Sequence, residues 1–298
     1  MKVLITGSTG LLAKGFEETA PGPQEIVGVH LRSYQAQDSR ARHRTLDVRD
    51  GAAVERLFSE ERFDAVVHAA GIASVDQVEK HPEEGRRSNL GGTLNVARAC
   101  REHGAYLVYV STNAVFDGTR PPYAEDSPTS PLHHYGRIKL ECEQAAAREA
   151  GPHAIVRPIL MYGWNHSVNR PNPVTWIYEK LLHGDEVQLV DDVFENPLHN
   201  HQCGRALWRI LERRPSGLFH LAGADRVSRW ELGLKVAETF GLDAALLQRV
   251  DSSRFPGIAP RPKDTTFSTW RMQEELGVAP MTLAEGLGQM KAAMGIGV

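Results

Sequence analysis

Short apolar runs alternate with helix-like stretches through the first half of the chain, and this alternation constrains the fold more than any other feature. The runs are bounded by turn residues and are rich in Val, Ile, Leu or Tyr: Lys2–Thr6, Glu25–His30, Ala65–His68, Tyr106–Ser111 and Ala154–Pro158. Amphipathic stretches separate them, among them Ala52–Glu60, Gly92–His103 and Leu132–Ala150. Continuous apolar runs suit strands that are buried on both faces. The pattern therefore predicts βαβ units and an α/β fold with a doubly wound parallel sheet.

The regular alternation of apolar and amphipathic runs ends after Tyr162. Residues 163–173 are rich in Asn, Pro and Gly and predict an ordered loop, and a second polar loop is expected to run through Asn200. Ser228 is expected to cap a helix that Gly241 ends. The other elements predicted in this half are helices at Val174–His183, Gln202–Arg213, Arg229–Phe240, Thr269–Gly277 and Thr282–Met294, and strands at Val187–Val190 and Gly217–Leu221.

Charge and cysteine content exclude several classes of protein. The 298 residues carry a formal net charge of −3, and Lys and Arg are scattered, so we expect neither nucleic acid nor a membrane surface as a partner. The cysteines (Cys100, Cys142 and Cys203) form no C-x-x-C pair, which is typical of a reducing compartment. No apolar stretch has the length of a membrane span and no signal-like segment precedes the first strand, so a cytoplasmic protein is expected.

A glycine-containing turn, Gly7-Ser8-Thr9-Gly10-Leu11-Leu12-Ala13, follows the first strand and opens the first helix. Glycines in this position let the backbone turn tightly and approach a pyrophosphate, which then lies on the helix N-terminus. Ala at the third position is tolerated for close packing of helix and strand. Because the turn lies in the first βα unit, it predicts binding of a dinucleotide on a Rossmann sheet.

The end of the second strand bears on the type of dinucleotide. A site for NAD usually carries an acidic residue there, which bonds the ribose 2′-hydroxyl. This strand runs into His30, Leu31, Arg32 and Ser33, and the first acid is Asp38. Arg32 and Ser33 are suited to a 2′-phosphate, so NADP(H) is favoured as the cofactor, and NAD(H) stays possible.

Tyr135 and Lys139 are spaced i, i+4, which places both side chains on one face of the predicted helix. A free Tyr has a pKa near 10, and a neighbouring ammonium is expected to lower this pKa toward the working range. Ser111 and Thr112 follow a buried strand, at the sheet edge where ligands bind in open α/β sheets. A hydroxyl from either one is placed to bond the same substrate oxygen as Tyr135. The arrangement predicts a proton donor for the reduction of a carbonyl by a nicotinamide.

The chain resembles the extended short-chain dehydrogenases/reductases, and within them most the dTDP-4-dehydrorhamnose reductases. The resemblance is spread over nearly the whole length. It is carried by Thr6–Ala13, Leu46–Val48, His68–Gly71, Val75-Asp76 with Glu79, Asn89–Asn95, Val110–Gly118, Pro122–Asp126, Tyr135–Lys139, Asp191–Pro197 and Arg261-Pro262.

The resemblance implies roles for particular residues. Thr112, Tyr135 and Lys139 match the catalytic triad of these enzymes, and Lys139 would also hold the nicotinamide ribose. Residues 1–160 and 196–222 would form the Rossmann domain, and 161–195 and 223–298 a smaller α/β C-terminal substrate-binding domain. The residues expected at the cofactor are Gly7, Thr9, Gly10, Leu11, Leu12, Arg32, Asp47, Val48, Ala69, Ala70, Gly71, Asn89, Ser111, Tyr135, Lys139 and Pro158.

Two departures from the family pattern concern the substrate. Asn113-Ala114 stands where related dehydratases carry an acidic pair, which disfavours dehydration. The loop 163–172 differs from that of a rhamnose-pathway enzyme, and its residues are either ordinary loop residues or the rim of a polar substrate site. Arg261 is a candidate for an anion contact, with a surface ion pair as the alternative. The expected substrate contacts are Val75, Asn113, Trp164, His166, Asn169 and Arg261.

We therefore expect an NAD(P)H-dependent reductase of a keto group on a nucleotide-activated deoxysugar or a similar polar carbonyl, with a homodimer as a possible assembly. One alternative is an epimerase of the same superfamily. The other is a non-catalytic NADP-binding regulatory subunit, because the β subunit of methionine adenosyltransferase resembles the same reductases. The 13 histidines include the pairs His133/His134 and His199/His201, but neither pair has the i, i+4 spacing of a helical zinc site, so no metal is expected.

Overall fold

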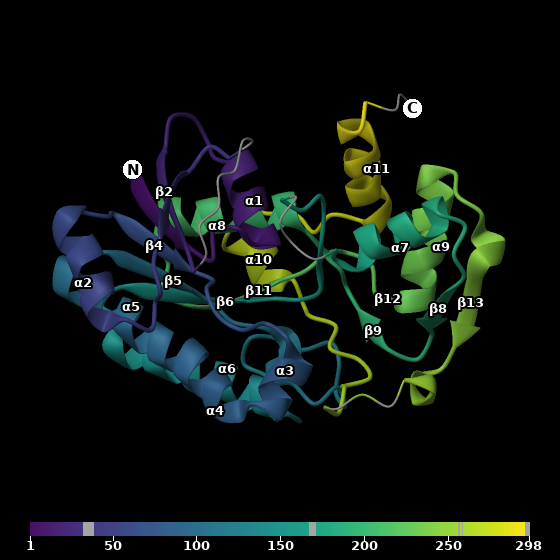
Figure 1. Ribbon diagram of the computed structural model, residues 1–298, viewed down its shortest axis with the longest axis horizontal. Helices are drawn as coiled ribbons and strands as arrows, with labels where there is room; N and C mark the ends of the chain where they lie inside the picture. Colours follow the sequence, from purple (N-terminus) through teal and green to yellow (C-terminus); the bar gives the residue numbers. More distant parts are fainter. Residues whose placement is uncertain (32–38, 167–170, 256, 258, 296–298) are drawn as a thin grey trace.

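A parallel sheet of seven strands forms the larger of two lobes in the computed structural model, which describes residues 1–31, 39–166, 171–255, 257 and 259–295 (Figure 1). The strand order is β11-β6-β5-β4-β1-β2-β3, and all six pairings are parallel. The strands are β1 (Lys2–Thr6), β2 (Glu25–His30), β3 (Arg42–Thr45), β4 (Ala65–His68), β5 (Tyr106–Val110), β6 (His153–Pro158) and β11 (Gly217–Leu221).

The central strands are apolar throughout because both faces of the sheet are covered. Along β1, Val3 and Ile5 pack into one hydrophobic core and Leu4 into the other. In β5, Tyr106 and Val108 likewise pack into the first of these cores and Leu107 into the second. Successive side chains of a strand point to opposite faces, so an unbroken apolar run is required where two layers of helices sandwich the sheet.

Helices of the two layers come from different parts of the chain. One face is covered by α1 (Leu11–Glu18), α8 (Asn200–Arg213) and α10 (Trp270–Glu274), and the other by α2 (Gly51–Glu60), α5 (Gly92–His103) and α6 (His134–Glu149). Short helical segments lie at α3 (Val75–Lys80), α4 (Pro82–Arg86), η1 (Arg87–Gly91) and η2 (Asn113–Val115). Together with the parallel sheet, these layers confirm the predicted doubly wound α/β fold.

Glycine allows α1 and α8 to pack at close range. A Cβ atom on Gly15 would lie 2.2 Å from the backbone oxygen of Asn200, and one on Gly204 would lie 2.3 Å from the backbone oxygen of Gly15. No side chain fits at such distances, so both positions require glycine. The sequence predicts a helix at each position but does not predict this contact. The contact brings the N-terminus of α8 against α1.

The smaller lobe, on the right in Figure 1, is built on the parallel pair β8 (Val187–Val190) and β13 (Leu247–Val250). Its helices are α7 (Pro173–Leu182), α9 (Arg229–Phe240) and α11 (Leu283–Ala293), and their apolar faces form a separate hydrophobic core. Two-stranded pairings join β7 (Met161–Tyr162) to β10 (Leu198–His199) and β9 (Phe194–Glu195) to β12 (Val227–Ser228). Single turns lie at η3 (Ala244–Leu246) and η4 (Ser252–Arg254).

Predicted and observed elements agree closely where the local signal is strong. Ser228 caps α9 through a reciprocal bond pair with Glu231, and Gly241 ends the helix in the left-handed conformation, as predicted. The predicted polar loop through Asn200 is wrong in part, because β9 and β10 interrupt it and α8 begins at Asn200. Two-residue strands and the charged strand β3 carry no alternating apolar pattern, so local sequence does not predict them.

The predicted domain boundaries stay a prediction, and the packing departs from them in one segment. Phe267, Met272, Leu276 and Val278 lie in the range assigned to the second domain, yet they pack into the first core. The reason is the exposed edge of the sheet at β11. The segment that contains α10 returns to cover this edge, and Arg271 donates a hydrogen bond to the backbone oxygen of Leu218.

Candidate active site at the carboxyl edge of the sheet

The turn after β1 forms a cradle of backbone atoms. Gly7 adopts φ +73°, and its N–H and that of Ser8 donate to the backbone oxygen of Val29 in β2. A Cβ atom on Gly7 would lie 3.1 Å from backbone atoms of Ala69 and Ala70. Helix α1 then begins at Leu11, and Gly10 at its N-cap supplies no side chain to cap it. The turn and helix N-terminus fit a pyrophosphate, which needs close backbone approach and unshared N–H groups.

The loop after β4 completes the cradle on its other side. The Thr6 hydroxyl accepts hydrogen bonds from the backbone N–H groups of Ala69 and Ala70 at 3.2 and 3.0 Å. Asn89 is buried and exchanges hydrogen bonds with both backbone groups of Ile72. Asn89 therefore holds the 69–72 loop in place.

The end of β2 lies beside the glycine turn. The side chain of His30 bonds the Ser8 hydroxyl at 3.0 Å, and His43 of β3 bonds the same hydroxyl at 3.2 Å. Gly28 makes room for this contact, since a Cβ atom there would lie 2.7 Å from Cβ of Ser8. Arg32 and Ser33, which predict the cofactor preference, lie outside the described residues.

Two further residues expected at the cofactor lie in the segment after β3. The carboxylate of Asp47 is paired with the guanidinium of Arg49, with Nη2 at 2.6 Å, and this bond lowers the pKa of Asp47 below its usual value. Val48 packs against Gly92 at the start of α5, and its backbone oxygen accepts from Asn95. The segment is thus anchored to α5.

Tyr135, Thr112 and Lys139 come together as the sequence predicts. Helix α6 is capped by His133, whose Nδ1 accepts from the N–H of Gly136, and this cap places Tyr135 in the first turn. The Thr112 hydroxyl lies close enough to the Tyr135 phenol to lower its pKa. Lys139 donates from Nζ to the backbone oxygen of Val110 at 2.7 Å. All three side chains are at least nine-tenths buried.

The sequence predicts that the pKa of Tyr135 is lowered, and this prediction is wrong for the chain without a bound ligand. Burial raises the pKa of Tyr135 to about 12, and the hydrogen bond from Thr112 opposes this only in part. The same burial lowers the pKa of Lys139. The Lys139 ammonium bonds the backbone oxygen of Val110, and its Nζ lies 4.4 Å from the ring centre of Tyr109. These contacts engage its charge away from the Tyr135 phenol. Tyr135 is therefore a protonated donor at neutral pH rather than a phenolate.

The hydroxyl of Ser111 has a different partner from the hydroxyl of Thr112. Its hydroxyl donates to the carboxylate of Glu143 at 2.5 Å, and that carboxylate is paired with the buried Arg157. Pro158 ends β6 beside Leu221 of β11. Of the two hydroxyls considered for the substrate oxygen, the structure favours that of Thr112.

The residues expected at the substrate are dispersed. Asn113 lies directly beside Thr112 and bonds Glu195 and Thr265. Val75 is the first residue of α3. Arg261 forms an ion pair with Asp76 at 2.9 Å, the alternative named for it.

The loop 163–172 contributes packing where it is described. Trp164 donates from its ring nitrogen to the backbone oxygen of Met290 and packs edge-on against Tyr178 and Phe240, so it is a packing residue of the smaller lobe. His166 is buried, close enough to His43 to contribute to the lowering of the pKa of His43 after burial and His30. Asn169 lies outside the described residues.

Two residues near Thr112 were missed by the sequence reading. Glu195 of β9 accepts from Asn113 at 3.0 Å, and Arg229 of α9 pairs with Glu195 at 2.6 Å. The only signal was the position of Glu195 within Asp191–Pro197, a segment that the family resemblance contains but to which it assigned no role. A contact across 82 residues leaves no trace in local periodicity.

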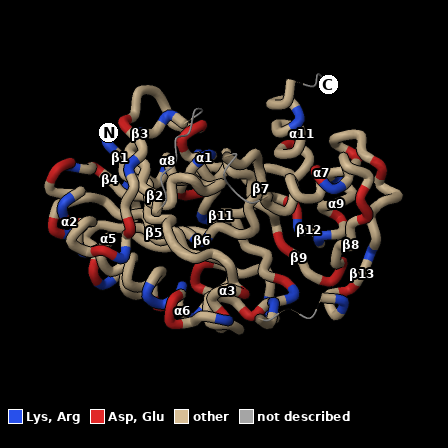
Figure 2. Tube along the Cα trace, viewed as in Figure 1, with Lys and Arg blue, Asp and Glu red and all other residues tan. Residues whose placement is uncertain are grey.

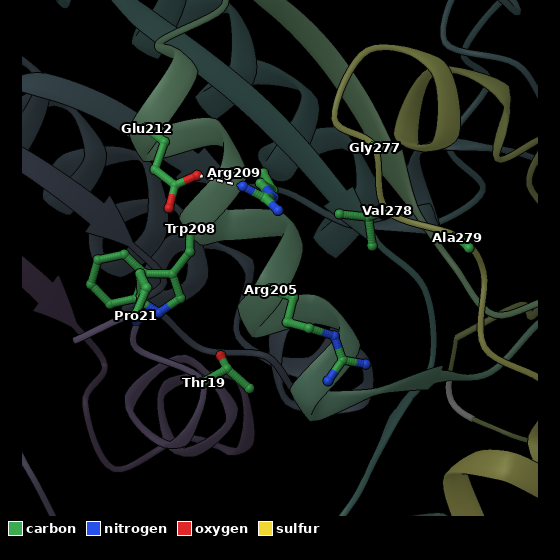
Figure 3. A pocket seen from close by; sticks show the side chains of 9 residues that line it. All are labelled: Thr19, Pro21, Arg205, Trp208, Arg209, Glu212, Gly277, Val278 and Ala279. Atoms are coloured by element: carbon green, nitrogen blue, oxygen red, sulfur yellow. Dashed lines mark hydrogen bonds and ion pairs between the residues drawn. The ribbon is translucent and has the colours of Figure 1, made fainter.

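One cavity of the molecule lies away from this site. It has a volume of about 410 Å³ and is lined by side chains at the end of α1, along α8 and at 277–279, among them Arg205, Arg209 and Trp208 (Figure 3). None of the predicted site residues lines it. In the described parts of the chain, no three His, Cys, Asp or Glu side chains gather as a metal site.

Charge and hydropathy give the surface no dominant character. Acidic and basic residues are interspersed along the trace of both lobes (Figure 2). Over the residues that could be searched, no helix has the length and apolarity to span a membrane.

Comparison with known proteins places the whole chain in one family. The model of the RmlD substrate binding domain matches residues 1–295. Methionine adenosyltransferase 2 subunit beta of Rattus norvegicus is 30% identical over 288 residues, covering 94% of this chain and 84% of that protein. A probable low-salt glycan biosynthesis reductase of Haloferax volcanii is 28% identical, covering 98% of each chain.

Solved structures agree. A dTDP-4-dehydrorhamnose reductase of Clostridium acetobutylicum superimposes with a TM-score of 0.86 at 25% identity, covering 99% of this chain and 100% of that one. A dTDP-4-dehydrorhamnose reductase of Bacillus anthracis in complex with NADP gives a TM-score of 0.84 at 25% identity, covering 98% of this chain and 99% of that one.

Proposed function

The chain belongs to the RmlD substrate binding domain family, and from this membership we propose that it is an NADP(H)-dependent reductase of a keto group on a nucleotide-activated deoxysugar. The solved relatives at 25% identity are dTDP-4-dehydrorhamnose reductases, which supports a nicotinamide-dependent oxidoreductase of this kind. A neighbour bound to NADP supports the nicotinamide, and the preference for NADP over NAD rests on Arg32 and the absence of an acid at the end of β2.

One observation carries the proposal: the side chains of Thr112, Tyr135 and Lys139 are all buried, and Thr112 lies close enough to Tyr135 to lower the pKa of its phenol. Thr112 lies after β5, the strand beside β4, and the loop after β4 forms part of the glycine cradle. A cofactor with its pyrophosphate on α1 would extend along this edge toward Tyr135, because ligands of open α/β sheets bind outside the carboxyl ends of the strands.

The chemistry assigned to the protein side chains is limited and specific. A bound nicotinamide supplies hydride to the carbonyl carbon. Tyr135 donates its proton to the carbonyl oxygen, and its raised pKa ensures that the proton is present at neutral pH. Lys139, one helical turn after Tyr135, would hold the nicotinamide ribose, as its place in the family's triad implies. Burial of the three groups excludes water from the reacting atoms.

The test is turnover of NADPH. Purified protein is mixed with NADPH and a panel of nucleotide 4-ketosugars, and loss of nicotinamide absorbance is followed for wild type and Tyr135→Phe. We expect turnover of at least one ketosugar, reduced by about 10²- to 10⁴-fold in Tyr135→Phe. Equal turnover by the two proteins contradicts the mechanism. Product formed without net change in NADPH indicates epimerisation instead.

The cofactor preference has its own test. Arg32→Ala is expected to weaken NADPH binding about tenfold or more and to leave NADH binding unchanged, since a guanidinium recognises a phosphate through charge-assisted hydrogen bonds. An equal effect on both nucleotides contradicts the preference for NADP.

A second candidate function is that of a non-catalytic NADP-binding subunit. It is favoured by the 30% identity to a methionine adenosyltransferase subunit over nearly the whole chain. Tight binding of NADPH, no turnover of any ketosugar, and a complex with a methionine adenosyltransferase catalytic subunit in size-exclusion chromatography together identify this function.

A further inference from the structure

Four buried side chains tie the 69–72 loop to the sheet and to helix α5. Each is at most 3% exposed, and they come from β1, β4, η1 and α5: Thr6, His68, Asn89 and Thr93. His68 lies in the middle, with Nδ1 2.7 Å from the Thr6 hydroxyl and Nε2 3.2 Å from the Thr93 hydroxyl. Thr6 and Asn89 hold the two ends of the 69–72 loop. The loop, which is one wall of the glycine cradle, thus closes a ring of hydrogen bonds through His68.

The Thr93 side of this ring decides where His68 carries its hydrogen. The Thr93 hydroxyl donates to the backbone oxygen of Asn89, one helical turn earlier, at 2.7 Å. A hydroxyl has a single hydrogen, so Thr93 meets His68 as an acceptor. The neighbouring thiol of Cys142 requires no hydrogen from Thr93, because burial raises the pKa of the thiol and keeps it protonated. Nε2 of His68 therefore carries a hydrogen and donates it to Thr93.

The Thr6 side of the ring requires the same tautomer. The Thr6 hydroxyl already accepts from the N–H groups of Ala69 and Ala70, which occupy its two lone pairs. It meets His68 by donating, so Nδ1 of His68 accepts. Burial, followed by the charge of Lys139, lowers the pKa of His68 to about 3, so the ring is neutral at neutral pH. A neutral imidazole has one donor and one acceptor nitrogen, and here Nε2 is the donor.

The tautomer bears on the shape of the cradle. Because Nδ1 of His68 takes the hydrogen of Thr6, the lone pairs of Thr6 are left to hold the N–H groups of the loop. A ring with its hydrogen on Nδ1 would donate to Thr6 and compete with those N–H groups for the same oxygen. The loop backbone at residues 69 and 70 lies 3.1 Å from the Cβ position of Gly7. A displaced loop therefore changes the space in which the pyrophosphate is expected to lie.

We propose that His68 is a positioning residue of the dinucleotide site, which as a neutral ring protonated on Nε2 orients the Thr6 hydroxyl and thereby holds the 69–72 wall of the glycine cradle. The inference rests on the proposed binding of a nicotinamide dinucleotide. It does not depend on the reaction that the dinucleotide serves, so its tests use binding and the protein without ligand.

The first test compares two substitutions of His68. His68→Leu removes both hydrogen bonds and is expected to weaken NADPH and NADH alike, by about tenfold or more, because both nucleotides carry the pyrophosphate. His68→Asn keeps an acceptor near the position of Nδ1 and is expected to bind both within about threefold of wild type. His220→Leu is the matched control, since His220 is also a buried neutral histidine of the sheet, on the edge strand β11. We expect it to bind both nucleotides within about twofold of wild type.

The second test asks whether His68 acts through Thr6. Thr6→Val removes the hydroxyl that joins His68 to the loop and is expected to weaken both nucleotides about tenfold or more. The double variant Thr6→Val with His68→Leu is expected to bind within about twofold of Thr6→Val alone, because residues of one hydrogen-bond network are not additive.

The third test needs no nucleotide. The ¹⁵N resonances of the His68 ring, identified by their absence in His68→Leu, report which nitrogen is protonated. We expect hydrogen on Nε2 throughout about pH 5 to 8. Thr93→Val removes the acceptor of Nε2–H and is expected to give a mixture of tautomers. Amide hydrogen exchange at Ala70 is expected to be faster in His68→Leu and in Thr93→Val than in wild type or His68→Asn.

Three results overturn the proposal. One is a wild-type ring with its hydrogen on Nδ1. Another is a folded His68→Leu protein that binds both nucleotides as wild type does. The third is a loss of affinity that follows the loss of thermal stability across His68→Leu, His68→Asn and His220→Leu. Where His68→Leu does not fold, Thr6→Val decides through affinity and Thr93→Val through the tautomer.

The reductase activity and the positioning role are separable in these tests. A wild-type protein that binds NADPH and turns over no ketosugar rejects the proposed reductase, and the affinities of the His68 variants still decide the positioning role. A protein that turns over a ketosugar while its His68 variants bind as wild type does keeps the reductase and loses the positioning role. A wild-type protein that binds neither nucleotide overturns both.

Discussion

Arg157 and Glu143 form a two-bond ion pair inside the protein, with Nε to Oε1 at 2.8 Å and Nη2 to Oε2 at 2.7 Å. The two side chains are 4% and 5% exposed. The carboxylate also accepts from Ser111, so the pair links α6, β6 and the residue that follows β5. The first prediction follows from this burial.

Arg157→Met is expected to destabilise the fold by about 3–5 kcal/mol, since removal of one partner leaves the other as an uncompensated buried charge. Unfolding in urea at pH 7 measures the change. Lys235→Met, which breaks an exposed pair with Glu238, is the control and is expected to cost at most about 0.5 kcal/mol. Similar values for the two variants would show that the buried pair is already hydrated.

Three buried histidines predict a loss of stability in acid. Burial lowers the pKa of His68, His199 and His220 to about 3 in each case. A folded pKa below the unfolded value near 6.5 means that the unfolded chain binds protons first as the pH falls. The stabilisation is complete above pH 6.5 and is lost between pH 6.5 and 3, by about 2 kcal/mol for each histidine at pH 5.

Urea unfolding at pH 5 and pH 7.5 measures this loss. His220→Phe serves as the matched variant, because the ring of His220 stacks on Phe267 with centroids 3.9 Å apart and a phenyl ring can occupy its place. Its stability is expected to depend less on pH, with about one proton fewer taken up on unfolding. An unchanged pH dependence would remove His220 from the explanation.

The close approach of α1 and α8 predicts opposite effects for two glycine substitutions. Gly15→Ala brings Cβ into the Asn200 backbone and is expected to destabilise the fold by about 1–3 kcal/mol. Gly288→Ala in α11 meets nothing within 4 Å and is expected to stabilise it by about 0.5–1 kcal/mol, because the unfolded chain loses freedom. Thermal unfolding compares the two, and the same sign for both would contradict the packing.

The edge strand β11 is protected by two side chains. Glu125 accepts from the N–H of His220 at 2.9 Å, and Arg271 donates to the oxygen of Leu218 at 2.7 Å. Exposed edges of sheets pair with other chains. Glu125→Ala combined with Arg271→Ala is therefore expected to self-associate in sedimentation velocity as concentration rises, whereas Lys235→Ala with Glu238→Ala does not. A double variant that sediments as wild type does would assign edge protection to the packing of α10 alone.

Lys139 predicts a separation of function from stability. Lys139→Met is expected to reduce turnover about 10²-fold or more, because the ammonium that would hold the nicotinamide ribose in place is lost. The fold is expected to keep or gain stability, because a buried ammonium whose pKa burial lowers is replaced by an apolar side chain. Turnover and urea unfolding of the same sample provide the check. Equal losses in both would make Lys139 a structural residue only.

Much of the candidate site could be read from local signals. The turn Gly7–Gly10 is recognised because tight turns before a helix need glycine, and Tyr135 and Lys139 are recognised because four residues make about one helical turn. The direction of the Tyr135 pKa could not be read in this way. It depends on burial by neighbours from several elements, which outweighs the nearby Lys139, itself directed to Val110.

The sequence by itself determined the parallel sheet, the helices between its strands and the glycine cradle, because these depend on periodicity and turn chemistry within a few residues. Only the tertiary structure decided which residues meet across the fold. The bond from Asn113 to Glu195 spans 82 residues and the contact of Gly15 with Gly204 joins two distant helices. Such contacts arise when elements pack, and neither partner's local sequence contains the geometry of the other.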